Sequence, residues 1–242
     1  QPLHVSIPRV PRGLLLVSAD PARAAAWVRR GLVACYVVPL AGWTAIVPAE
    51  PASRAKPPYD DPVTVLASRP VPHRLRPARG FWATGGRAVA TVAPRGWRSG
   101  LRWLVWQPGE GAVRAPGLRL ARIADLSVAA GRPASRAEVG AVVTQRGGDP
   151  DTVLVDLMAV LRLPGSGMLS GGLPRGDLRG ALRPGNAGSH ASSSAGSSAD
   201  AEASSTGHED VGFVVEPSLR AVMRFDAQVG EDARHRAELE EL

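Results

Sequence analysis

Residues 13–38 read GLLLVSADPARAAAWVRRGLVACYVV, and this stretch decides the fold because two apolar runs flank the signals of one short helix. The first run, residues 14–18, is almost continuously apolar, which is typical of a strand buried on both faces. The second run, residues 33–38, predicts another strand. With the helix between them, the two strands predict a β-α-β unit.

The helix between these strands carries its own start and stop signals. Asp20 can accept hydrogen bonds from the free amides of a helix start, and Pro21 suits the first helical position, where a missing N–H costs nothing. These residues predict a helix over residues 22–30. Gly31 is predicted to end it by adopting the left-handed conformation.

Further strands follow this unit along the chain. Five prolines between residues 48 and 62 predict an irregular excursion, and a later glycine pair tolerates the positive φ angles of a tight hairpin turn. The predicted strands are residues 43–47, residues 63–68, the two arms around Gly85 and Gly86, and residues 101–107.

From Gly117 onward the apolar spacing becomes helical. Three short helices are predicted: one with apolar residues between 118 and 128, one that opens at Ser135, and one that opens at Asp149 and Pro150. Strands followed by helices are typical of the α+β class, with α/β as the alternative. The sequence therefore predicts a mixed β-sheet packed by the first helix and by these three.

Composition divides the chain into three parts. Residues 1–163 hold enough apolar side chains for a globular body, with its sheet in residues 1–116 and its helices in residues 117–163. Residues 164–210 are rich in Gly, Ser, Ala and Pro, which bury too little apolar surface to offset the entropy of ordering, so a disordered linker is predicted. Residues 211–242 are acidic and regain apolar side chains, and we expect an interaction segment there.

Charge is distributed unevenly along the chain. Residues 1–126 hold 18 Arg and Lys against 6 Asp and Glu, a net charge of +12, whereas residues 199–242 hold 4 against 11, a net charge of −7. A basic body can attract nucleic acid, because neutralised phosphates release counterions. Only Lys56 among the 29 basic residues is not arginine, a bias typical of GC-rich genomes, which weakens arginine content as evidence for such a partner.

The nucleic-acid alternative has named candidate residues. A proline-rich loop over residues 69–79 carries four arginines, and an arginine and a tryptophan share one face of the strand at 101–107. Both faces of that strand are mostly apolar, so a core position for its tryptophans is the preferred interpretation. The candidates are Arg69, Arg74, Arg76, Arg79, Arg102 and Trp106.

The C-terminal segment supplies the candidates for protein binding. A strand is predicted over residues 211–215, and a helix with one apolar face follows Pro217. A short apolar segment on an acidic tether is typical of a docking element. The candidates are Phe213, Val215, Leu219, Val222 and Met223.

Catalysis finds little support in the residue pattern. The five histidines are scattered, and Cys35, the only cysteine, lies in an apolar run, so it forms no intramolecular disulfide and no cysteine zinc cluster. We expect no catalytic residues, no cofactor and no metal site; the enzyme alternative needs a site assembled from distant residues. No apolar run reaches the length of a membrane span and no secretion signal is evident, so a cytoplasmic location without membrane contact is expected.

These observations favour a non-enzymatic, cytoplasmic binding or adaptor protein that acts through protein–protein contacts. A nucleic-acid-associated protein is the alternative. The sequence alone leaves the partner and the oligomeric state open.

Overall fold

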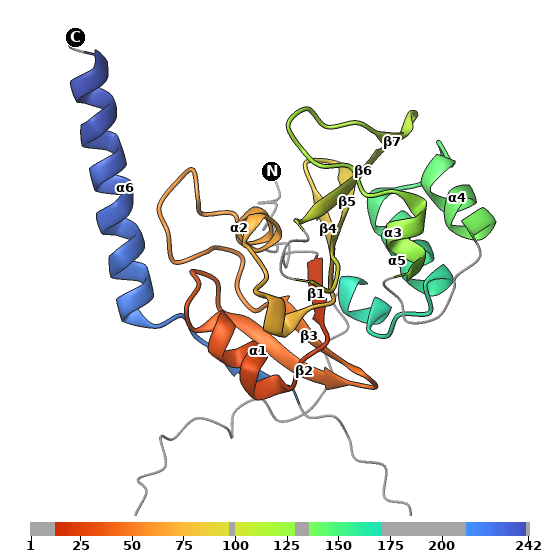
Figure 1. The fold of residues 1–242 in the computed structure, drawn as a ribbon, viewed down its shortest axis with the longest axis horizontal. Helices are drawn as coiled ribbons and strands as arrows, with labels where there is room; N and C mark the ends of the chain where they lie inside the picture. Colours follow the sequence, from red (N-terminus) through yellow and green to blue (C-terminus); the bar gives the residue numbers. More distant parts are fainter. Residues whose placement is uncertain (1–12, 97–99, 129–135, 171–211, 241–242) are drawn as a thin grey trace, which may run out of the picture.

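The computed structural model describes residues 13–96, 100–128, 136–170 and 212–240. Its centre is an eight-stranded sheet with strand order β7-β6-β5-β4-β1-β3-β2-β8, in which every pair of neighbouring strands is antiparallel (Figure 1). The strands are β1 (Gly13–Val17), β2 (Cys35–Leu40), β3 (Trp43–Pro48), β4 (Ala78–Thr84), β5 (Arg87–Ala93), β6 (Arg102–Gln107), β7 (Gly111–Val113) and β8 (Phe213–Val215). The helices are α1 (Pro21–Val28), α2 (Pro62–Ser68), α3 (Ile123–Val128), α4 (Arg136–Thr144), α5 (Pro150–Val160) and α6 (Leu219–Glu240), with the short 3₁₀ helices η1 (His73–Leu75) and η2 (Ser166–Ser170). The predicted α+β class is confirmed.

The strand, helix and strand predicted at the start of the chain are all present, but the two strands are not neighbours. β3 lies between β1 and β2 and pairs with both, so that Ala45 faces Leu16 on one side and Val38 on the other. β1 is buried along its whole length, as its continuous apolar run predicts. A β-hairpin, β2–β3, thus supplies the antiparallel neighbour of β1.

α1 begins where the sequence places it but ends differently. The Asp20 side chain accepts a hydrogen bond of 2.9 Å from the Arg23 N–H, with Pro21 in the first turn. The predicted left-handed conformation of Gly31 is wrong, because this glycine has no positive φ. Its missing side chain instead makes room for the Arg69 guanidinium, which a Cβ at Gly31 would overlap.

The predicted strand over residues 63–68 is wrong, because these residues form α2. Asp61 accepts hydrogen bonds from the N–H groups of Val63 and Thr64, and Pro62 occupies the first turn. A cap of this strength selects the helix for a short apolar run whose periodicity suits either structure.

The glycine hairpin is confirmed. Gly85 and Gly86 join β4 to β5 with φ angles of 56° and 71°, which fit the two-residue turn that glycine favours. β6 then pairs with β5 and matches the strand predicted over residues 101–107.

Helices cover the two faces of the sheet in different regions. On one face, α3, α4, α5 and η2 pack over the sheet, and α5 lies over β4 and β5 (Figure 1). On the other face, α1 packs on β2 and β3, and α2 packs on β4. Each face has its own apolar core, so the arrangement has three layers.

Of the three later helices, α5 begins where it is predicted and α3 is shorter than predicted. α5 opens at Asp149 and Pro150 as predicted, and Asp149 accepts from the Asp151 and Thr152 N–H groups. α3 begins only at Ile123.

The predicted cap of α4 at Ser135 lies outside the described residues, and so do residues 171–210 of the predicted linker. Within the described start of that linker, η2 places two side chains, Met168 and Leu169, in the core.

Candidate functional site

β8 fastens the C-terminal segment to the edge of the sheet. Val215 pairs with Cys35, and Phe213 pairs with Val37. Val215 is only 2% exposed and belongs to the core that α1 and α2 cover, while Phe213 packs against the same core. Burying one such valine stabilises the attachment by about 1.5–3 kcal/mol. Apolar packing on this core and pairing with β2 therefore hold the segment together.

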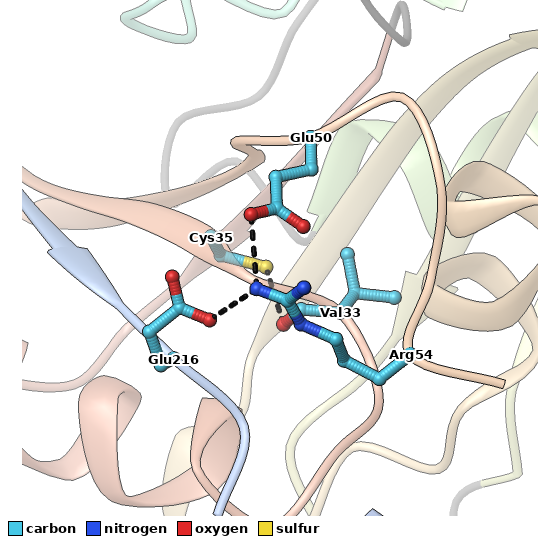
Figure 2. Close-up of polar contacts among 5 residues, drawn as sticks. All are labelled: Val33, Cys35, Glu50, Arg54 and Glu216. Atoms are coloured by element: carbon cyan, nitrogen blue, oxygen red, sulfur yellow. Dashed lines mark hydrogen bonds and ion pairs between the residues drawn. The ribbon is translucent and has the colours of Figure 1, made fainter.

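An arginine on the loop after β3 adds a polar link to the end of β8 (Figure 2). Arg54 Nη2 donates to Glu50 Oε1 at 2.9 Å and to Glu216 Oε2 at 2.8 Å. The hydrogen bond from Arg54 to Glu216 raises the pKa of Arg54. All three side chains are exposed to solvent, where such pairs contribute about 0–1 kcal/mol. The pairs position the segment more than they stabilise it.

Cys35 lies beneath this link and is chemically inert in the folded chain. Its Sγ donates to the Val33 carbonyl at 3.4 Å, and burial raises the pKa of the thiol. A neutral, buried thiol is neither a nucleophile nor a metal ligand. The core position expected for Cys35 is confirmed.

α6 leaves the body immediately after this attachment. The Ser218 N–H donates to the Arg29 carbonyl at the end of α1 at 2.8 Å, and Phe225 meets Tyr59 edge to face with ring centroids 5.4 Å apart. Beyond these contacts α6 projects away from the sheet and its covering helices (Figure 1). Its 22 residues correspond to a length of about 33 Å.

The structure divides the five candidates for protein binding into two groups. Phe213 and Val215 belong to the chain's own sheet, and Val222 is half-buried. Leu219 and Met223 remain 75% and 63% exposed, one helical turn apart on α6. Only these two form an apolar surface that another molecule can reach.

Two arginines of the nucleic-acid alternative lie within the fold, Arg69 half-buried and Arg79 buried. Arg69 lies 3.9 Å from the centre of the Trp27 ring and donates to the Trp27 carbonyl at 2.7 Å, which joins α2 to the end of α1. Burial lowers the pKa of Arg69 to about 10. Arg79 is 1% exposed and points from β4 into a core.

The other four candidates are spread over separate regions. Trp106 is 1% exposed and its indole N–H donates to the Gln145 carbonyl at 2.7 Å, so its core position is confirmed. Arg102 forms an ion pair with Asp125. Arg76 donates to two backbone carbonyls, those of Val71 and Gly96, and Arg74 is exposed. The six side chains do not gather on one exposed surface.

Sequence reasoning missed the residues that hold the C-terminal segment in place. They are Arg29, Glu50, Arg54, Tyr59 and Glu216 together with Phe225. Arg54 and Glu216 are 162 positions apart, and no local pattern links residues at such a separation. The only usable signal was the opposite charge of the two regions.

An open cavity of about 400 Å³ lies where β1 meets the start of α1. Asp20 and Trp43 both line it, but the Asp20 carboxylate is already engaged by the N–H of Arg23 and, at 3.2 Å, by its Nε. The other polar side chains of the lining are the hydroxyls of Ser18 and Thr44, and Thr44 Oγ1 donates to the Ala19 carbonyl at 2.6 Å. The Asp20 carboxylate and the Thr44 hydroxyl thus serve the local fold, one at the start of α1 and the other on the Ala19 carbonyl.

In the part of the chain that the structure describes, no three His, Cys, Asp or Glu side chains gather closely enough to hold a metal ion. Across the described ranges, none of the helices combines the length and apolar character needed to cross a membrane. No family model matches this sequence, and neither curated proteins nor solved structures include a significant match to it.

Proposed function

We propose that this chain is a non-enzymatic binding or adaptor protein that presents α6 to a protein partner. One observation carries the proposal: Leu219 and Met223 are exposed on a helix that stands off the body. Among the described helices and strands, none packs along α6 to cover this face. Exposed apolar side chains one turn apart are the pattern by which a helix docks into a groove.

The charges around this pair specify the partner further. Arg220 and Arg224 are exposed on the same two turns of α6. An apolar groove with carboxylates on its rim would complement both the apolar pair and these arginines. Burying each of the two apolar side chains contributes about 1–2 kcal/mol. We place this function in the cytoplasm, since the chain's single cysteine is a buried thiol.

The proposal predicts that L219E/M223E loses its partner without losing its fold. Both side chains are solvent-exposed and glutamate favours helix, so the thermal midpoint stays the same while captured partners are lost. The measurement is quantitative mass spectrometry of proteins retained by the tagged full chain. The matched control is L118E/L120E, which changes two leucines that are 42% and 45% exposed elsewhere. Equal capture by both double variants would contradict the proposal.

Nucleic-acid binding is the alternative, and its support is the net charge of +12 in residues 1–126. Salt-dependent binding of a labelled oligonucleotide by the full chain, unchanged in L219E/M223E, would favour it over a protein partner.

A further inference from the structure

A second feature, independent of α6, is a buried arginine that has no counterion among the residues that the structure describes. Arg79 is 1% exposed, and its Nε, Nη1 and Nη2 are all buried without a hydrogen-bond partner. It pairs across the sheet with Leu16 on β1 and Val92 on β5, both fully buried. Burial lowers the pKa of Arg79 to about 10, which leaves the group charged at neutral pH.

A second guanidinium lies on the same face two strands away. Val92 pairs with Arg102, which places Arg79 and Arg102 in one cross-strand row, about 10 Å apart at their Cα atoms. Arg102 Nη1 forms an ion pair with Asp125 Oδ1, but Arg102 Nε is buried without a partner. A long arginine side chain spans much of this separation.

The carboxylate of Asp125, which pairs with Arg102, already has hydrogen-bond partners on both oxygens. Asp125 Oδ1 accepts from Arg102, and Asp125 Oδ2 accepts from the Arg122 N–H at 2.8 Å. The buried guanidinium of Arg79 and the partly exposed guanidinium of Arg102 therefore have one carboxylate between them, which leaves one positive charge and four buried nitrogen atoms without an acceptor among the described residues.

Proteins rarely leave such a group uncompensated, because a buried charge without a partner is strongly unfavourable. The planar fork of arginine matches the two oxygens of a carboxylate or phosphate group in a bidentate pair. Arg79 is the second residue of β4 and Arg102 the first of β6, so both lie near the same end of the sheet.

We propose that Arg79, assisted by Arg102 Nε, binds a small oxyanion, either a carboxylate or a phosphate group. The anion supplies the acceptors that the two side chains lack, and it enters when side chains at this end of the sheet move aside. The site is separate from α6, so its test does not depend on the proposed function.

The test compares chemical unfolding of the full chain in sodium phosphate, sodium acetate and sodium chloride at equal ionic strength. A ligand that binds only the folded chain, at ten times its dissociation constant, lowers the unfolding equilibrium constant about 11-fold. We expect this effect from phosphate or acetate and not from chloride, and the effective salt identifies the ligand group. R79M should lose the effect, while R74M, which changes an exposed arginine, should keep it.

A wild-type chain that responds equally to all three salts would overturn the proposal, and so would an R79M variant that keeps the oxyanion effect. If R79M does not fold, hydrogen exchange of the wild-type chain decides the matter. Protection by the oxyanion should centre on β4 and the start of β6. Protection confined to other segments, or none, would also overturn the site.

Discussion

The indole of Trp82 shows how single residues set the sheet. Trp82 is fully buried, and its Nε1 donates to Thr91 Oγ1 at 3.3 Å. The ring lies against the backbone of Gly13 and Gly80, where a Cβ on either glycine would overlap it. These glycines are required for their small size, since neither has a positive φ.

G80A is therefore expected to destabilise the chain by about 1–3 kcal/mol, because the added methyl group forces the Trp82 ring and the Thr91 hydroxyl out of place. Urea unfolding, followed by tryptophan fluorescence, measures the change. G147A is the control, because no atom lies within 4 Å of a Cβ there. A loss of stability in G147A as large as that in G80A would show that the contact with Trp82 is not the cause.

The sequence did not predict which arginine side chains are exposed to solvent. The sequence marks the loop over residues 69–79 as basic, yet Arg69 stacks on Trp27 and Arg79 enters a core. Whether an arginine faces water depends on residues distant in sequence that meet it in the fold. The buried position of Trp106 was predicted correctly, because its strand is mostly apolar on both faces.

At the scale of helices and strands, the sequence analysis predicted the helix starts at Asp20 and Asp149 but not the order of the strands in the sheet. Asp20-Pro21, Asp61-Pro62 and Asp149-Pro150 each open a helix, by the same combination of a capping carboxylate and a proline in the first turn. The second was mistaken for a strand because its apolar run is short. The insertion of β3 between β1 and β2 depends on pairing that no local pattern specifies.

β8 provides a test of attachment at the scale of one strand. V215A should weaken its packing by about 2 kcal/mol, since two buried methyl groups are lost. Cys35, which pairs with Val215, is the natural reporter. We expect a thiol reagent to modify Cys35 at least tenfold faster in V215A than in the wild-type chain, and mass spectrometry follows the modification.

L219A is the control for this measurement, because Leu219 is 75% exposed and contributes no packing to β8. An unchanged rate in V215A would mean that Cys35 becomes accessible without release of β8.

For the whole molecule, the C-terminal segment is part of the fold as well as a candidate surface. Removing residues 212–242 should lower the thermal midpoint and cause association that increases with concentration, because β2 becomes an unpaired edge and the core loses Val215. Calorimetry and light scattering measure the two effects. Removing only residues 226–242, which follow Phe225, should change neither. A stable, monomeric chain that lacks residues 212–242 would show that β8 is dispensable.

The position of β8 in the sheet also bears on synthesis. A ribosome completes β2 at Leu40 and adds about 170 further residues before Phe213. At 5–20 residues per second this takes roughly 10–35 s. During that time the edge of β2 that pairs with β8 in the finished chain has no partner strand. A chaperone that shields extended backbone could occupy that strand in the interval, and its release would have to precede closure by the last strand.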